Sequence, residues 1–327
     1  MKTIRIGIIG GAGYTGGELI RVLVQHPVSE IVFVHSRSNA GKAVTSVHRD
    51  LIGETDLYFT DTHTQEIDLL FLCLGHGASR AFLEHNTIKE HIKVIDLAND
   101  FRIQDQALWK GHAFIYGLPE LQKEKIKTAQ YLANPGCFAT AIQLGLLPLA
   151  AAGVLGAVYT TGITGSTGAG QSLSSTSHFS WRANNIQAYK TLSHQHLTEI
   201  GQSLKQLQAD IPADAVHFIP WRGDFPRGIF VSTQLKNDLS LDALYTLYEH
   251  YYREHPFVHL SKDPIDLKQV VNTNKCLIQI EKQGEDTVIH STIDNLLKGA
   301  VGQAVQNMNL MFGLEEMTGL HLKSLVF

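Results

Sequence analysis

A short apolar segment that runs directly into a glycine-rich turn constrains the fold of this chain more than any other feature. Residues 4–9, IRIGII, are typical of a buried strand, and residues 11–16, GAGYTG, follow with the pattern G-x-G-x-x-G. Glycines at these positions permit a tight turn and a close approach of the backbone to a pyrophosphate, which then lies at the positive N-terminus of the next helix. The chain is therefore predicted to open with a dinucleotide-binding unit, and a purely structural glycine turn is the alternative. The residues expected to contact the cofactor here are Gly10, Gly11, Gly13, Tyr14, Thr15 and Gly16.

Strand and helix signals alternate through the first part of the chain. Helices are expected at residues 18–26, where Pro27 ends the pattern, and at residues 78–85. Strands are expected at residues 4–9, 31–34, 67–74 and 94–97. Strands that alternate with helices at this spacing predict a parallel sheet built from βαβ units.

The pattern changes near residue 136. A helical run at residues 138–149 is expected to stop at Pro148 and Gly153, and a last helix is expected at residues 296–311. The strands expected between them, at residues 228–235, 276–281 and 287–293, carry polar side chains at alternate positions. This alternation is typical of an antiparallel or mixed sheet with one exposed face.

Composition excludes several classes of protein. The 327 residues suggest about two domains at roughly 150 residues each. A formal charge of −4 gives no basic face, so neither nucleic acid nor an anionic membrane is an expected partner. Three cysteines do not make a disulfide framework. Without a cleavable signal or an apolar run of about 18 residues, the protein is expected to be soluble and cytoplasmic.

The residues after the second expected strand indicate which dinucleotide binds. A site that prefers NAD carries an acidic residue there, which holds the ribose 2′-hydroxyl. Residues 35–39 read HSRSN and contain no carboxylate, whereas Ser36, Arg37 and Ser38 offer two hydroxyls and a guanidinium. These groups suit a 2′-phosphate. We therefore predict NADP(H), with a solvated turn as the alternative.

Cys137 is the predicted nucleophile. It follows Asn134-Pro135-Gly136 and precedes an apolar helix, so it is expected near that helix's N-terminus, where the dipole and free N–H groups stabilise a thiolate. A thiolate beside a dinucleotide site favours a covalent acyl-thioester or thiohemiacetal that exchanges hydride with nicotinamide. Cys73 and Cys276 lie in apolar or alternating segments and are expected to be buried without a role.

A general acid/base is expected to accompany the thiol. His194 and His196 are the best candidates because imidazole titrates near neutrality, and their spacing does not say which of them acts. No clear third and fourth ligand accompanies this His-x-His, so no metal site is predicted.

Several motifs in order along the chain resemble one known family. They are residues 14–16 YTG, 96–102 DLANDFR, 116–120 YGLPE, 134–137 NPGC, 188–190 AYK with the His-x-His after it, 226–228 PRG, 294–300 DNLLKGA and 302–309 GQAVQNMN. Together they resemble the N-acetyl-γ-glutamyl-phosphate reductases of arginine biosynthesis, and the matches span nearly the whole chain.

The resemblance implies an α/β fold like that of glyceraldehyde-phosphate and aspartate-semialdehyde dehydrogenases. It implies a Rossmann NADP-binding domain of residues 1–136 and 297–327, and a catalytic and oligomerisation domain of residues 137–296 with a mixed sheet. It further implies that Cys137 attacks the γ-acyl phosphate, that phosphate leaves, and that NADPH reduces the thioester to N-acetylglutamate γ-semialdehyde. Asn295, Lys298 and Asn307 are expected to frame the cofactor, together with Gly168 in a polar loop that could close on cofactor or substrate.

The substrate carries a carboxylate and an acyl phosphate, so the site needs cations. The residues expected to bind it are Arg102, Tyr189, Lys190 and Arg227, with Arg182 a further candidate. Where many family members read Pro-His-Leu, this chain reads Pro220-Trp221-Arg222, and the added cation suggests the hypothesis of an N-succinyl substrate. The sequence is also compatible with an aspartate-semialdehyde-type dehydrogenase and with a dinucleotide-binding regulator that has lost catalysis. The expected partners are a small-molecule substrate and further copies of the chain, as a dimer or tetramer.

Overall fold

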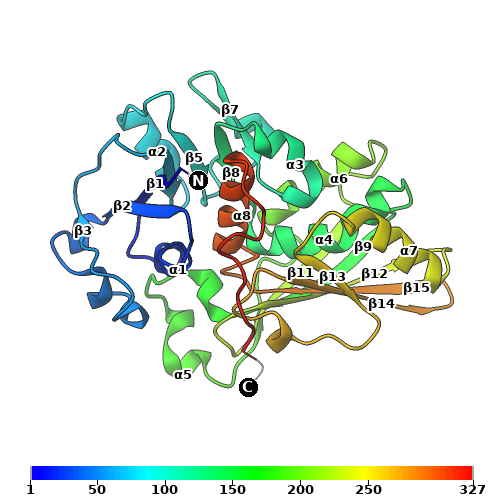
Figure 1. Cartoon of the computed structure of the whole chain (residues 1–327). Coiled ribbons are helices and arrows are strands. Elements are labelled where there is room, and N and C mark those ends of the chain that lie inside the picture. The colour runs from blue at the N-terminus through cyan, green and yellow to red at the C-terminus, as the bar shows by residue number, and fades with distance from the viewer. Residues whose placement is uncertain (1, 326–327) are drawn as a thin grey trace. The chain divides into compact units, whose positions relative to one another are not determined.

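The computed structural model describes residues 2–325, which form two units (Figure 1). The first unit holds residues 2–135 together with Ala300–His321, and the second holds Gly136–Gly299 together with residues 322–325. Within residues 2–325, no helix is long and apolar enough to cross a membrane.

The first unit is built on an eight-stranded sheet in the order β3-β2-β1-β4-β5-β8-β7-β6. All neighbouring pairs are parallel except β6 with β7, as expected for βαβ connections. Its strands are β1 Ile4–Ile9, β2 Ser29–His35, β3 Phe59–Thr60, β4 Leu69–Leu72, β5 Lys93–Asp96, β6 Leu108–Trp109, β7 His112–Tyr116 and β8 Tyr131–Ala133. Its helices are α1 Tyr14–Leu23, α2 Ala78–His85, α3 Pro119–Lys127 and α8 Val301–Met311.

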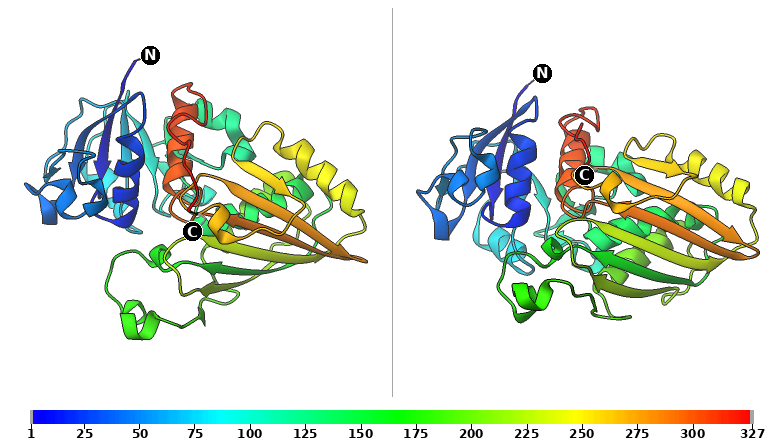
Figure 2. Two further views of the ribbon diagram at one scale, coloured as in Figure 1. Left: turned by 60° about the horizontal axis from the view of Figure 1, so that its bottom comes forward. Right: turned by 90° about the horizontal axis from the view of Figure 1, so that it is seen from below.

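The second unit contains a seven-stranded mixed sheet in the order β10-β11-β9-β12-β15-β14-β13. Figure 2 shows these strands, green to orange, side by side in one twisted sheet. The strands are β9 Val158–Thr164, β10 Gln187–Ala188, β11 Val216–Arg222, β12 Ile229–Lys236, β13 Val258–Ser261, β14 Cys276–Gln283 and β15 Asp286–Ile293. The helices are α4 Cys137–Ala151, α5 Phe179–Arg182, α6 His196–Leu207 and α7 Leu241–Tyr252.

The expected alternation of the second sheet is present. On β12, Val231 and Leu235 are buried while Gln234 is exposed, because α4 packs against β12 and β15 on one face. The core of this unit therefore lies between the sheet and α4, which contacts α6 and α7 in turn. The other face carries Tyr159, which is 62% exposed.

The prediction that Pro148 stops the helix of residues 138–149 is wrong. Helix α4 continues through Pro148 to Ala151 and is buried along almost its whole length. A proline inside a helix removes the hydrogen bond to the carbonyl four residues earlier, here that of Leu144. The Tyr252 hydroxyl donates to the Leu144 carbonyl instead, and the Tyr248 hydroxyl donates to the Gly145 carbonyl at 2.5 Å. Tyr252 of α7 thus replaces the donor that the proline removes, and Tyr248 adds a bond to the next carbonyl.

Two other helix boundaries differ from the sequence prediction. Helix α1 begins at Tyr14, four residues earlier than expected, and already ends at Leu23. Its first turn contains Gly16 and Gly17, whose poor helix propensity hides the start from a pattern of apolar residues. The last helix begins at Val301 and not at residue 296, because residues 296–299 form a turn whose N–H groups bond to Asp294.

Candidate active site

The glycine turn between β1 and α1 has the geometry that its sequence predicts. Gly10 has φ +82°, and a Cβ on it would lie 2.4 Å from the Cys73 carbonyl oxygen. A Cβ on Gly16 would lie 2.6 Å from the Gly11 Cα, so the helix and the turn pack too closely for any residue other than glycine at this position. Gly13 is the N-cap of α1, with nothing nearer to its Cβ position than 3.9 Å, and Tyr14 is 41% exposed at the first turn. The turn therefore offers a backbone cradle and a helix N-terminus, which fit a pyrophosphate.

The residues after β2 fit a phosphate-bearing ribose. Arg37, Ser38 and Asn39 form a short 3-10 turn in which the Arg37 and Ser38 side chains are exposed. Ser36 is buried, and its hydroxyl accepts a hydrogen bond from the Asn39 amide at 3.3 Å. The Arg37 guanidinium is thus exposed to solvent on a turn that the hydrogen bond between Asn39 and Ser36 holds in place. The contact of these residues with cofactor stays a prediction.

Cys137 is the first residue of α4, with Gly136 as the extended N-cap. A Cβ on Gly299 would lie 2.8 Å from the Cys137 Cβ, so the turn at residues 295–299 packs directly against the cysteine. Cys137 is partly exposed and Cys276 is buried as predicted, whereas Cys73, also predicted to be buried, is partly exposed as a residue although its thiol is desolvated. Burial is the main cause of a strongly raised pKa of the Cys73 thiol. Only Cys137 therefore combines access with a helix N-terminus.

The structure distinguishes the two histidines. His196 is the first residue of α6, and a Cβ on Gly136 would lie 2.3 Å from its Nε2, so its imidazole sits directly against the residue that precedes Cys137. Its Nε2 lies 3.8 Å from Oε1 of Glu199, and the other carboxylate oxygen accepts the Gly136 N–H at 3.0 Å. Glu199 is 2% exposed. A buried carboxylate thus holds both the imidazole and the backbone beside the nucleophile.

His194 lies in a more apolar environment. Its ring contacts Phe138, Phe218 and Tyr189 edge-on, and its Nδ1 accepts the His196 N–H at 3.3 Å. Burial, followed by the positive charges of His196 and Lys190, lowers the pKa of His194 to about 3. An imidazole with this pKa stays neutral near pH 7 and is a weak base there.

Tyr189 and Lys190 differ in how close they lie to the cysteine. The Tyr189 hydroxyl has its pKa raised to about 12, first by burial and then by the charge of Cys137. Tyr189 is therefore near the thiol. Lys190 is exposed, and its Nζ donates to the Gln195 side chain at 2.6 Å.

The two arginines predicted from their motifs make structural contacts. Arg227 pairs with Asp294 through Nε and Nη2, at 3.1 and 3.2 Å, and Asp294 is fully buried. Arg102 is 6% exposed, and its Nε and Nη2 each donate at 2.8 Å to a carbonyl, those of Asn134 and Leu97. These bonds hold the strand ends that precede Cys137 in the chain. Substrate binding by either arginine stays a prediction.

The residues expected to frame the cofactor from the second half of the chain are also held by protein contacts. Asn295 accepts the Gly228 N–H at 2.7 Å and donates to the Thr167 hydroxyl at 3.0 Å, in the loop that contains Gly168. Lys298 is fully buried, with its Nζ over the Phe257 ring. In the first unit, the Asn307 amide donates to the Gly117 carbonyl at 2.8 Å. Asn295 therefore fixes the polar loop, and the cofactor contacts of all four stay predictions.

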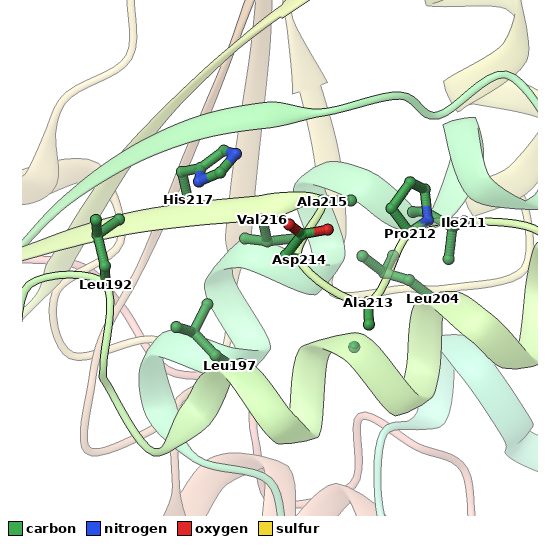
Figure 3. Close-up of a pocket in the computed structure, with 11 residues that line it drawn as sticks. Leu192, Leu197, Leu204, Ile211, Pro212, Ala213, Asp214, Ala215, Val216 and His217 are labelled. Atoms are coloured by element: carbon green, nitrogen blue, oxygen red, sulfur yellow. The ribbon is translucent and has the colours of Figure 1, made fainter.

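Helix α6 also borders a pocket of about 280 Å³ that is separate from this arrangement (Figure 3). Leu197 and Leu204 line it from α6, and Val216 and His217 line it from β11. Its lining includes none of the predicted site residues among those the structure describes.

Comparison with known proteins identifies the family. Residues 5–129 match the semialdehyde dehydrogenase NAD binding domain, and residues 137–295 match the semialdehyde dehydrogenase dimerisation domain. A Bacteroides thetaiotaomicron protein named N-acetyl-gamma-glutamyl-phosphate reductase is 57% identical over 99% of this chain and 100% of its own length. A Flavobacterium johnsoniae protein of the same name is 56% identical over 98% of both chains. The chain belongs to the N-acetyl-γ-glutamyl-phosphate reductase family of the semialdehyde dehydrogenases.

Solved structures agree with this family fold. The aspartate semialdehyde dehydrogenase II of Vibrio cholerae superposes with a TM-score of 0.74, at 15% identity, over 96% of this chain and 99% of its own. The aspartate semialdehyde dehydrogenase of Candida albicans, solved with NADP, gives 0.67 at 15% identity, over 95% and 99%. These likenesses confirm the predicted α/β fold with its Rossmann-type and mixed sheets. The resemblance read from the sequence motifs is confirmed by the reductase relatives.

Sequence reasoning missed two residues that the reductase fold places in this arrangement. Glu199 follows His196 by three residues on a helix, which puts both on one face, and this spacing was the available signal. Asp294 stands inside the DNLLKGA motif, but nothing local predicts that its partner is Arg227, which is 67 residues away.

Proposed function

We propose that the protein catalyses the NADPH-dependent reduction of N-acetyl-γ-glutamyl phosphate to N-acetylglutamate γ-semialdehyde and phosphate, a step of arginine biosynthesis. The observation that carries the chemistry is the placement of His196 and the buried Glu199 against Gly136, the residue before Cys137. The relatives that carry this name, at 56–57% identity over almost the whole chain, support the substrate.

The residues of the second unit divide the reaction between them. His196 takes the thiol proton, and the Cys137 thiolate attacks the γ-acyl carbon; a carbon–sulfur bond forms, the carbon–oxygen bond to phosphate breaks, and phosphate leaves. NADPH, when bound by the first unit, would supply the hydride for the thioester carbon. The resulting oxyanion on the Cys137 adduct reforms the carbonyl, which breaks the carbon–sulfur bond and releases the aldehyde. Cys137 then recovers its proton from His196.

The acid/base role goes to His196 for two physical reasons. Its imidazolium form gains from the Glu199 carboxylate 3.8 Å away, whereas burial lowers the pKa of His194 to about 3. His194 instead accepts the His196 N–H and packs against Phe138, so its role is to position the turn that begins α6. Glu199 is likewise a positioning residue, since it bonds Gly136 and faces His196.

The first unit would hold the cofactor. The backbone at Gly11, Gly13 and Gly16 with the N-terminus of α1 would take the pyrophosphate, and Arg37 would pair with the 2′-phosphate. A mechanism that needs Cys137 in its reduced form favours a reducing, cytoplasmic setting.

The open face of the second unit's sheet supports assembly as a homodimer. It exposes Tyr159, stacked on His217 at 4.8 Å, and carries the pair Phe230 and His290 at 5.6 Å. The match to a dimerisation domain covers this sheet. Light scattering is expected to report a dimer, or a tetramer built from such dimers, and a Phe230→Asp variant that keeps the wild-type mass would contradict this face.

The reaction is best tested in its reverse direction. The assay combines enzyme, NADP, phosphate and N-acetylglutamate semialdehyde and follows the absorbance of the NADPH formed. We expect phosphate-dependent turnover by the wild type and none by Cys137→Ser, while Cys276→Ser keeps wild-type rates because Cys276 is buried in β14. Turnover by Cys137→Ser, or turnover without phosphate, would reject the proposed mechanism.

A further inference from the structure

Two arginines lie beside each other at one edge of the second unit's sheet. Arg222 is the last residue of β11, paired in register with Thr164 of β9 and Gln187 of β10. Arg182 ends the short helix α5, in the segment between β9 and α6 that loops out from the sheet (Figure 2). Its Nη2 donates to the carbonyl of Gly223, the residue that follows Arg222. The loop therefore brings a second guanidinium to the end of β11.

This arginine pair has hydrogen-bond donors that no protein group satisfies. Nε and Nη1 of Arg182 and Nε of Arg222 are buried from solvent, and none of the three has a partner within residues 2–325. Buried donors are normally paired, because an unpaired one loses its hydration without replacement. Three unmet donors on two adjacent cations are therefore unusual in a folded protein.

The charges of the pair are also poorly balanced. Burial and then the charge of Arg222 lower the pKa of Arg182, and Asp224 opposes this shift as the smaller effect. Asp224 is exposed, and its Oδ2 accepts the Asn184 N–H at 2.6 Å. Two like charges held together with unmet N–H groups are an arrangement that an oxyanion would neutralise.

The pair adjoins the reaction centre through Tyr189. The Arg222 guanidinium lies 4.8 Å from the centre of the Tyr189 ring, and its charge opposes the rise in the pKa of the Tyr189 hydroxyl. The charge of Cys137 contributes to the raised pKa of Tyr189, and the centres of the Tyr189 and His194 rings lie 5.7 Å apart. A group bound by the arginines would therefore belong to a molecule that reaches Cys137.

We propose that Arg182 and Arg222 bind one oxyanion group of the substrate, a carboxylate or a phosphate. This inference rests on the proposed function, which supplies such groups from three places. They are the leaving phosphate, the α-carboxylate, and a carboxylate at the end of the N-acyl group if that group is succinyl. Arginine suits all three, because its planar N–H groups match carboxylate and phosphate oxygens in pairs.

The test compares Arg182→Gln and Arg222→Gln with Arg253→Gln, an exposed arginine after α7, as control. In the reverse assay, KM is measured for N-acetyl and N-succinyl semialdehydes and for phosphate. We expect each variant to raise one of these by about 10- to 100-fold, as loss of a charge-assisted hydrogen-bond pair implies, and the control to raise none. A rise for the succinyl compound alone assigns the acyl carboxylate, an equal rise for both semialdehydes assigns the α-carboxylate, and a rise for phosphate alone assigns the phosphate.

A second measurement separates this inference from the proposed function. The rise in Tm on adding N-acetylglutamate, N-succinylglutamate or inorganic phosphate is recorded for each protein without any turnover. The oxyanion site predicts that one ligand stabilises the wild type and Arg253→Gln, and that both site variants lose the effect. If the wild type shows no turnover but the Tm rises follow this pattern, the proposed function is rejected and the oxyanion site is retained. The oxyanion site is rejected if every KM of the two site variants stays within threefold of the wild-type value and their Tm rises with each ligand also stay within threefold of the wild-type rises. Should a glutamine variant fold poorly, Arg222→Lys, which keeps the charge, is used under the same criteria.

Discussion

Replacing Glu199 with glutamine tests whether its charge supports the transfer of the Cys137 proton. The side chain is 2% exposed, its Oε2 accepts the Gly136 N–H at 3.0 Å, and its Oε1 lies 3.8 Å from Nε2 of His196. Glutamine keeps the size and can still accept the Gly136 N–H through its carbonyl oxygen. What it removes is the negative charge that faces His196 when His196 holds the proton.

The magnitude follows from this distance. Two unit charges 3.8 Å apart interact by about 4 kcal/mol at an effective dielectric constant of about 20. The glutamine amide can offer its dipole to the imidazole in part, so we expect a loss of about 2–4 kcal/mol in transition-state stabilisation. This corresponds to a fall in kcat/KM of about 30- to 1,000-fold. Folding stability is expected to change little or to rise, because a buried charge is removed.

The assay is the reverse reaction at saturating NADP and phosphate, with the semialdehyde varied. Glu249→Gln is the matched control, since Glu249 is exposed on α7 and its variant should keep the wild-type kcat/KM. Urea unfolding of both variants shows that the fold is intact. A kcat/KM of Glu199→Gln within threefold of wild type, with an intact fold, would refute the charge-support argument and leave Glu199 with only its bond to Gly136.

Three further predictions concern the cofactor turn, helix α4 and one buried acid. Arg37→Glu is expected to raise KM for NADPH by about 10- to 100-fold and KM for NADH much less, because the exposed guanidinium is replaced by a like charge to the 2′-phosphate; equal changes for both cofactors would contradict the assignment. Tyr252→Phe is expected to cost about 1–3 kcal/mol in urea unfolding, since the Leu144 carbonyl then has neither the tyrosine donor nor the N–H that Pro148 lacks; a loss no larger than that of the exposed Tyr58→Phe would contradict it. Burial raises the pKa of Asp96 to about 6 in the folded protein, so the folded state binds more protons than the unfolded one between about pH 4 and 6, and the stability that Asp96 contributes at low pH is lost as the pH rises. Asn cannot titrate, so the free energy of unfolding of Asp96→Asn relative to wild type is expected to rise by up to about 3 kcal/mol between about pH 4 and 7, and a pH-independent difference would refute the assignment.

Local chemistry decided which parts of the fold could be predicted from the sequence. The turn after β1 was predictable because Gly10 and Gly16 are required by contacts within a few residues or with the neighbouring strand. Helix α4 was not, because the tyrosine that compensates for Pro148 lies 108 residues from the carbonyl it bonds. A local sequence pattern shows that a proline lacks its N–H, but it does not show that the hydroxyl of a distant helix donates to the carbonyl instead.

The candidate site shows the same division. Cys137 and the His-x-His could be singled out because a helix N-terminus and a titratable pair are readable in sequence. The choice between His194 and His196 required burial and the position of Glu199, which only the packed structure supplies. Arg102 shows the converse, since its motif suggested a ligand but its guanidinium bonds two backbone carbonyls.

One row of the second sheet explains why segments so far apart in sequence meet at this site. In register, Arg222 pairs with Thr164, Thr164 with Ile229, Ile229 with Ile293, and Ile293 with Cys276. Strand pairing therefore fixes where four of these segments leave the sheet. The loop of Gly168 follows Thr164 at the end of β9, and the ion pair of Arg227 with Asp294 joins the residues just before β12 and just after β15. Arg182 contacts the end of β11 through its bond to Gly223. A slip by one residue in any pairing would turn every side chain of that strand to the other face. The register of the sheet therefore fixes the positions of Arg222 and of the segments that carry Gly168, Arg227 and Asp294, whereas Cys137 and His196 are placed by helices α4 and α6.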